Sequence, residues 1–291
     1  MKPAFLVTLL WVATGAGAQA SSVPSTEIRY DSRSRPVIAT QVNHQGPYFM
    51  VVDTGAESSL MMPALAAHLK LESFDTGLTI NGATGVIAAK AFPVDSFTSE
   101  LFDVSYVGLL EVPYAGSTEA AGIIGMDLFA DNALVFDYAS RAMRVVPSGE
   151  VQGKYVTVPA LADDSLLIRV NVKMNGVDIP ALVDTGAAAT IANLAALKAL
   201  GWHLTDPHLT DDGTIQGATS DSSQIKKTTI DTIALGGITL RDVPVRFTTQ
   251  ADGQTPSLIL GTDVLNSLIG FAVDFPKQEF LIFLPDTNTP S

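Results

Sequence analysis

The sequence predicts an all-β protein of two similar lobes with a few short helices. One reason is the local pattern: short β-rich runs bounded by Gly, Pro or Asn recur at 37–42, 48–52, 166–174 and 181–183. A second reason is an internal repeat that spans about half of the chain. The length of 291 residues agrees with two lobes, because it exceeds the usual size of one hydrophobic core.

The repeat consists of five segments in the same order in both halves. They are VNHQG and VKMNG at 42–46 and 172–176, VVDTGAESSL and LVDTGAAATI at 51–60 and 182–191, TINGATG and TIQGATS at 79–85 and 214–220, GIIGMDLF and LILGTDVL at 122–129 and 258–265, and LVFDYASRAMRVV and FAVDFPKQEFLIF at 134–146 and 271–283. We therefore predict a tandem duplication, with lobes at 21–148 and 149–291. Pro, Gly and charged residues interrupt two apolar runs at 147–154, which is the predicted linker.

Each half also has helical segments at matching places. Helices are expected at 63–71 and at 191–200, the second closed by Gly201. A further short helix is expected after Gly125 and after Gly261.

The first 20 residues have the composition of a secretory signal. They contain one lysine, an apolar stretch at 4–12 and small residues up to Ala20, where we expect cleavage and export to a periplasm or the medium. The alternative, an uncleaved anchor helix, fits less well because the apolar run is short for a bilayer span.

Composition excludes several classes of function. The chain has no Cys, which excludes disulfides, thiol catalysis and cysteine metal sites. Removal of Lys2 with the signal leaves 16 basic and 30 acidic residues, a net charge of −14. We expect such a protein to repel nucleic acid and, after signal cleavage, anionic membranes.

A single DTG is most simply a strand followed by a tight turn, because Asp caps turns and Gly supplies positive φ. Here the motif occurs twice, each time after an apolar run and each time followed later by an apolar pair and Gly. In this pattern, from Ile28 to Leu284, the chain resembles the aspartic peptidases of the pepsin and retropepsin clan. The resemblance implies two acid-protease lobes of six to seven strands, closed like barrels and related by a pseudo-twofold axis.

The resemblance also assigns roles to the repeated residues. Asp53 and Asp184 would form a catalytic pair that activates water without any cofactor or metal. The residues that would support this pair, by bonding across the axis or by allowing close approach of the loops, are Thr54, Gly55, Ala56, Thr185, Gly186 and Ala187. Retropepsins also have Ala after DTG, whereas pepsins have Ser or Thr, and loss of that hydroxyl donor predicts activity at mildly acidic pH.

The apolar pair and glycine that follow in each half would pass under the DTG loops. This implies structural roles for Gly125 and Gly261. An Asp in the first turn of a helix offsets exposed N–H groups, so we also expect Asp127 and Asp263 to be structural.

TINGATG predicts a hairpin turn at Asn81-Gly82. By resemblance, this hairpin and its counterpart would be flaps that close over a bound peptide. The flap residues would be Asn81, Gly82, Ala83, Gln216, Gly217 and Ala218. Two flap candidates favour a fused retropepsin-like dimer; the alternative is a pair of ordinary exposed hairpins.

These features together predict a monomeric, exported aspartic endopeptidase that takes peptide or protein substrates. The alternative is a peptidase-fold module that binds peptides without cleaving them. His203 and His208 lack the spacing of a zinc peptidase, and no GxSxG motif occurs.

Overall fold

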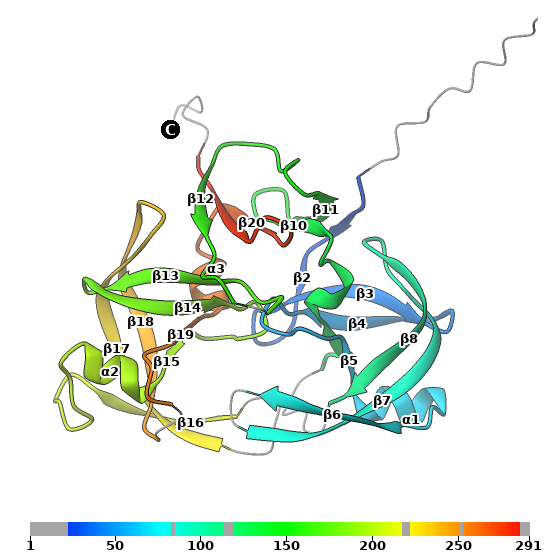
Figure 1. Ribbon diagram of the computed structural model, residues 1–291, viewed down its shortest axis with the longest axis horizontal. Helices are drawn as coiled ribbons and strands as arrows, with labels where there is room; N and C mark the ends of the chain where they lie inside the picture. The colour runs from blue at the N-terminus through cyan, green and yellow to red at the C-terminus, as the bar shows by residue number, and fades with distance from the viewer. Residues whose placement is uncertain are drawn as a thin grey trace, which may run out of the picture.

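The computed structural model describes residues 23–82, 85–112, 119–163, 165–216, 222–250 and 253–285. Most of these residues are in β-strands, and Figure 1 shows two lobes side by side with a third sheet against both. Among the described residues, no helix has the length and apolar character needed to cross a bilayer.

The N-terminal lobe is a closed barrel of six strands. In barrel order they are β3 (Pro36–Val42), β4 (Gln45–Val52), β9 (Gly122–Ile124), β5 (Leu60–Met61), β8 (Asp103–Glu111) and β7 (Gly85–Thr98). Pairing of β7 with β3 closes the barrel, while β2 (Arg29–Tyr30) and β6 (Phe74–Gly82) extend its edges. Closure leaves no edge strand within the barrel itself.

The C-terminal lobe repeats this arrangement. Its strands are β13 (Arg169–Met174), β14 (Val177–Val183), β19 (Leu258–Leu260), β15 (Ile191–Ala192), β18 (Ile238–Thr248) and β17 (Ser222–Leu235), with β16 (Thr210–Gln216) as the extension. Pairing of β13 with β17 closes the ring. The predicted fold class, an all-β protein of two similar barrel-like lobes, is therefore confirmed.

A third sheet joins the lobes and combines strands from both halves. Its order is β1 (Ser25–Glu27), β11 (Ala142–Pro147), β10 (Asn132–Asp137), β20 (Gly270–Asp274), β21 (Glu279–Phe283) and β12 (Tyr155–Pro159). The central pair, β10 and β20, comes one from each half and is antiparallel, with Phe136 directly opposite Phe271. These two rings stack with centroids 4.6 Å apart, and both are fully buried.

The helices are short, as predicted, but their limits differ from the expected ones. They are α1 (Pro63–Leu69), α2 (Leu194–Ala199), the 3-10 turn η1 (Met126–Leu128) and α3 (Thr262–Leu265). The second helix starts later than position 191 because Ile191 and Ala192 pair with β19. Asn193 then caps the helix by accepting a hydrogen bond from the Ala196 N–H at 2.8 Å.

The predicted turn at Asn81-Gly82 was two residues too early. Asn81 pairs with Val86 and Gly82 with Gly85, so both residues belong to β6 and the reversal follows Gly82. The register of the long β6–β7 ladder, which pairs Ile80 with Ile87, overrides the local Asn-Gly preference for a two-residue turn.

The stacked pair between the lobes gives a test of how the halves are held together. Phe271→Ala should lower the free energy of unfolding by about 3 to 5 kcal/mol, because it empties a fully buried ring site. Phe74→Ala removes the same side chain from a half-exposed position and should cost about 1 kcal/mol or less. Urea unfolding of both variants measures the difference; equal losses would contradict the role given to the stacked pair.

Candidate active site

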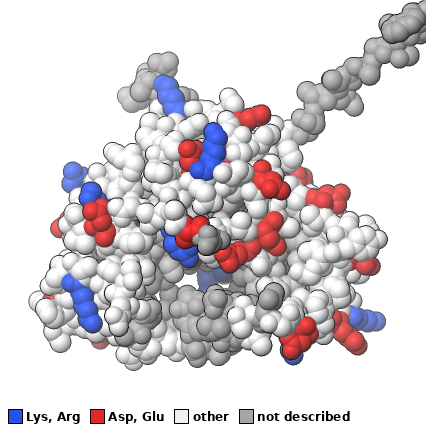
Figure 2. Space-filling view, viewed as in Figure 1, with Lys and Arg blue, Asp and Glu red and all other residues white. Residues whose placement is uncertain are grey.

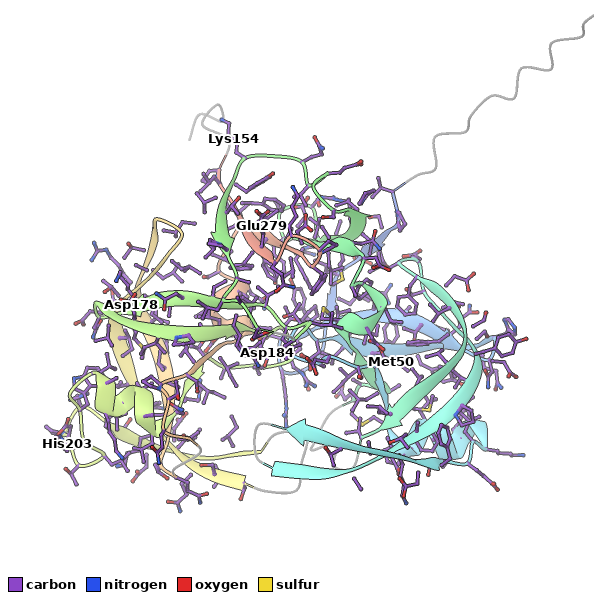
Figure 3. The ribbon with its side chains drawn as sticks, in the orientation of Figure 1. Met50, Lys154, Asp178, Asp184, His203 and Glu279 are labelled. Carbon is purple, nitrogen blue, oxygen red and sulfur yellow. The ribbon has the colours of Figure 1, made fainter. Side chains whose placement is uncertain are left out.

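Both DTG aspartates lie where a barrel strand ends and the chain turns out of the sheet. Asp53 directly follows β4 and Asp184 directly follows β14. The backbone N–H of Asp53 donates to Ile124 of β9 at 3.0 Å, and that of Asp184 donates to Leu260 of β19 at 3.1 Å. Figure 3 shows Asp184 at the centre of the molecule, where the lobes meet.

Two threonines tie the DTG loops together across the lobe boundary. The hydroxyl of Thr54 donates to the carbonyl of Val183 at 2.7 Å, and that of Thr185 donates to Val52 at 2.6 Å. Each hydroxyl also accepts the backbone N–H of the other threonine at 3.0 Å. Both residues are at most 2% exposed, so the four bonds are shielded from water. The structure therefore places Thr54 and Thr185 as reciprocal partners.

The glycines of the two motifs lie against the opposite aspartate. A Cβ added at Gly55 would lie 2.5 Å from the carboxyl carbon of Asp184. A Cβ at Gly186 would overlap the Asp53 carboxyl. Glycine is thus required at both positions by close approach, and the two carboxyl groups lie next to each other across the lobe boundary.

Backbone N–H groups of the loops hold the carboxyl groups in place. The N–H of Gly55 donates to Asp53 Oδ1 at 2.8 Å, while Gly186 and Ala187 donate to Asp184 Oδ1 at 2.8 and 2.9 Å. Each aspartate retains part of its surface open to solvent, but protein crowds around the rest.

Desolvation raises the pKa of both aspartates. For Asp53, burial outweighs the opposing hydrogen bonds and the charge of Arg35. For Asp184, burial and the adjacent charge of Asp53 together raise the pKa well above its ordinary value. Two neighbouring carboxyl groups with raised pKa values favour a state in which they share one proton.

The segments under the loops follow the same design in both lobes. In the N-terminal lobe the N–H of Gly125 donates to Ser59 Oγ at 3.0 Å, and Asp127 accepts from the Ser59 hydroxyl and N–H at 2.9 and 3.2 Å. A side chain at Gly125 would overlap the backbone of Ser58. Burial raises the pKa of Asp127, with the Ser59 hydrogen bonds opposing that rise.

In the C-terminal lobe Thr190 takes the place of Ser59. Its hydroxyl accepts from Gly261 at 3.1 Å, and Asp263 accepts from the Thr190 hydroxyl and N–H at 2.7 and 3.0 Å. The two acidic residues do occupy the first turns of η1 and α3, but their side chains bond these hydroxyl residues and are not helix N-caps. Sequence reasoning did not assign roles to Ser59 and Thr190, although their 131-residue offset, equal to that of the aspartates, was a signal.

The remaining predicted residues fall in three groups. The carbonyls of Ala56 and Ala187 accept from Met126 and Thr262 at 2.9 and 2.8 Å, which anchors each loop to the segment below. The backbones of Asn81, Gly82 and Gln216 lie at the ends of β6 and β16. Ala83, Gly217 and Ala218 lie outside the described residues.

Figure 1 shows how the two long hairpins relate to the loops. The β6–β7 and β16–β17 hairpins, one from each lobe, extend toward each other on the side of the molecule opposite the interlobe sheet. The DTG loops lie between that sheet and the hairpins.

Two contacts across the lobes were not predicted from the sequence. Arg35 Nη1 donates to the carbonyl of Gly186 at 3.5 Å, and Ser165 Oγ donates to Glu57 Oε1 at 2.6 Å. Neither contact has a matching residue pair in the other half, so the repeat offered no signal for them.

The described residues provide no group of three or more His, Asp or Glu side chains that could hold a metal ion. His208, one of the two loop histidines, packs edge-on against Trp202 with ring centroids 4.4 Å apart.

Comparison with known proteins gives the family of the chain. The model of the aspartyl protease family matches residues 38–128 and 170–264, which is well over half of the chain. The chain belongs to the aspartyl protease family. Each matched segment of this aspartyl protease contains one DTG loop and the strand that passes under it.

Among solved structures, the protein is similar to a retropepsin-like aspartic protease from Rickettsia conorii. The identity is 20%, the TM-score is 0.36, and the match covers 44% of this chain and 89% of the other. No curated protein matched the sequence.

The threonine bonds give a test of loop rigidity. Thr54→Val keeps the shape but leaves the Val183 carbonyl and the Thr185 N–H without a partner, so it should lower the unfolding free energy by about 1 to 3 kcal/mol. Thr185→Val should cost the same because the bonds mirror each other. Thr54→Ser keeps the hydroxyl and serves as the control in denaturant unfolding. A loss confined to one of the two valine variants would contradict the reciprocal arrangement.

The raised pKa of Asp184 predicts a pH-dependent stability effect. Below its ordinary value of 3.8 the group is protonated in both folded and unfolded states, so it imposes no penalty. As pH rises, ionisation favours the unfolded chain, and stability falls until pH exceeds the folded pKa. Asp184→Asn should therefore stabilise the protein at about pH 7, by about 1.4 kcal/mol for each pH unit separating the two pKa values, and give no gain at about pH 3.

Thermal unfolding at both pH values measures this effect. Asp178→Asn is the control, because this aspartate lies at the outer part of the same lobe (Figure 3) and its pKa is lowered by hydrogen bonds from Lys173 and Asn171. It should give no gain at pH 7. A destabilised Asp184→Asn at pH 7 would contradict the inferred desolvation.

Proposed function

We propose that this aspartyl protease is an exported endopeptidase that hydrolyses peptide bonds with water activated between Asp53 and Asp184. The observation that carries the proposal is the reciprocal threonine network, which holds two carboxyl groups with raised pKa values next to each other. A paired structural turn has no need for adjacent carboxyl groups, whose mutual repulsion is unfavourable.

The chemistry follows from proton sharing. One ionised carboxylate accepts a proton from a water molecule, while the other, protonated carboxyl donates to the carbonyl oxygen of the substrate. The water oxygen bonds to the carbonyl carbon and forms a neutral tetrahedral diol. Transfer of a proton to the amide nitrogen then breaks the C–N bond, and both carboxyl groups return to their starting state. The residues of this chain suffice for these steps.

The substrate we propose is an extended peptide held between the DTG loops and the two converging hairpins. Figure 2 shows the molecule hollowed at the centre of this face, with acidic side chains along the edge of the hollow. An extended chain can pair its backbone with strand edges there. Ala83, Gly217 and Ala218 would belong to these flaps.

The raised pKa values support activity at mildly acidic pH. Cleavage requires one proton on the pair, so the active range lies between loss of that last proton and gain of a second one. Desolvation raises the pKa of both aspartates above the ordinary carboxyl range, so both limits of the active pH range move upward. The absence of a hydroxyl at Ala56 and Ala187 acts in the same direction.

Export rests on the composition of residues 1–20, and the monomeric state rests on the presence of both DTG loops in one chain. The substrate partners we propose are peptides and proteins. The strongly acidic composition argues against binding to nucleic acid or anionic membranes.

Cleavage of a peptide library by the purified protein tests the proposal. Asp53→Asn and Asp184→Asn should each lower kcat/KM by about three orders of magnitude or more, since each removes one half of the proton relay. Asp178→Asn, an exposed aspartate, should leave it unchanged. Peptide binding without cleavage by the wild type between about pH 3 and pH 7 would instead favour a binding module.

A further inference from the structure

Arg35 is a partly buried arginine beside the DTG loops that the proposed chemistry has not used. It lies in the turn between β2 and β3, and its Nε and Nη2 donate to Asp31 Oδ2 at 2.8 and 2.6 Å. The side chains of Arg35 and Asp31 are only 12% and 5% exposed. The remaining nitrogen, Nη1, reaches the carbonyl of Gly186 in the opposite loop.

The turn that carries Arg35 is docked on the C-terminal lobe. Asn266, just after α3, donates to the carbonyl of Ser34 at 3.0 Å. The backbone N–H groups of Arg33 and Arg35 both donate to Asp31 Oδ1 at 2.9 Å. The guanidinium is therefore fixed in position by bonds from its own turn and from both lobes.

The C-terminal lobe has no arginine at the position that matches Arg35. Val37 pairs with Val51, which lies two residues before Asp53, and Arg169 pairs with Leu182, two residues before Asp184. Counting back two residues from Val37 gives Arg35, and from Arg169 it gives Leu167. At the same structural position, one lobe has an arginine and the other a leucine.

The support of the two carboxyl groups is otherwise built from the same kinds of bonds in both lobes. The threonine bonds are mirrored, and backbone N–H groups from the loops favour the charged form of both aspartates. Among the leading influences on Asp53, Arg35 is the charged side chain that favours the ionised form by its charge. Arg35 thus introduces a charge on one side of a support that is otherwise mirrored.

We propose that Arg35 is a positioning residue that sets the direction of proton sharing, keeping Asp53 ionised and the shared proton on Asp184. This inference rests on the proposed peptidase function. Asp53 then takes the proton from water, and Asp184 gives its proton to the carbonyl oxygen. When the diol breaks down, Asp53 passes its proton to the amide nitrogen and Asp184 recovers a proton from a diol hydroxyl, so both return to their starting state.

Other titratable groups near the site do not produce the same asymmetry. Asp31 bonds Nε and Nη2 of Arg35, whereas Nη1 contacts the opposite loop, and the hydrogen bonds and charge of Arg35 hold the pKa of Asp31 below its usual range despite burial. Asp127 and Asp263 lie under the two loops at matching places. Asp263 also lies 3.8 Å from Nη1 of Arg246, an arginine that is shared with a second carboxylate, Asp212. Glu57, in the Asp53 loop, is exposed and bonded to Ser165; its negative charge would act against ionisation of Asp53 and cannot replace Arg35.

Carbon-13 NMR of the aspartate carboxyl groups tests this inference without requiring cleavage. Resonances of Asp53 and Asp184 are assigned from the Asn variants, and each is titrated in the full chain. Asp53 should titrate at lower pH than Asp184 in the wild type. Arg35→Gln should raise the pKa of Asp53 by roughly 0.5 to 1 through loss of a nearby opposite charge, and Arg35→Lys should retain the wild-type order.

Asp31→Asn is the decisive second variant, because it removes the carboxylate that bonds Nε and Nη2 of Arg35 and so strengthens the effect of the arginine charge on Asp53. It should lower the pKa of Asp53. If Arg35 had a purely structural role, Arg35→Gln and Asp31→Asn would both shift the pKa of Asp53 in the same direction. Arg144→Gln, which breaks an Arg–Asp pair in the interlobe sheet, is the matched control and should change neither resonance. If Arg35→Gln does not fold, Asp31→Asn decides by itself.

The outcomes separate this inference from the proposed function. An unchanged or raised pKa of Asp53 in Asp31→Asn overturns the role of Arg35. So does a wild-type titration in which Asp53 has a higher pKa than Asp184. Cleavage that survives Asp53→Asn and Asp184→Asn overturns the peptidase proposal. Where cleavage is measurable, the acidic limb of its pH profile should move up in Arg35→Gln and down in Asp31→Asn.

Discussion

Two carboxyl groups placed next to each other and partly removed from water repel one another when ionised, and each loses hydration. This arrangement depends on a support that holds both loops regardless of protonation. The four bonds between Thr54 and Thr185 and the carbonyls of Val52 and Val183 provide it. Because neutral groups make all four bonds, titration of the aspartates leaves the support intact.

The rest of the molecule positions that support. Each DTG loop emerges from a closed barrel, and the segment beneath it is fixed by a glycine, a hydroxyl residue and an aspartate. The interlobe sheet joins the two barrels, because β10 of one half pairs with β20 of the other. The stacked rings of Phe136 and Phe271 pack at this junction. Without cysteines, this relation between the lobes depends on strand pairing, packing and the side-chain hydrogen bonds between them.

Symmetry explains the geometry of the site, but an acid and a base must differ. A single chain can introduce this difference where a dimer of identical subunits in one symmetric state cannot. The Arg35–Asp31 pair and the Glu57–Ser165 contact are both departures from the repeat at the lobe boundary. In this view duplication preserved the shared support, and divergence of the halves changed the charges around it.

The all-β class, the two similar lobes and the paired motifs could be predicted from the sequence, because the strand patterns and the DTG segments occur twice in the same order. The barrel form of each lobe followed from the family resemblance. Some strand and helix limits differed from the predicted ones. Ile191 and Ala192 pair with β19 instead of starting a helix, and Asn81 and Gly82 pair with β7 instead of forming the turn. Only the tertiary structure decided that the loops meet, that Asp127 and Asp263 bond hydroxyl residues, and that Arg35 reaches the opposite loop. These contacts join residues 66 to 151 positions apart, where local propensity carries no information and only the packing of the two lobes sets the partners.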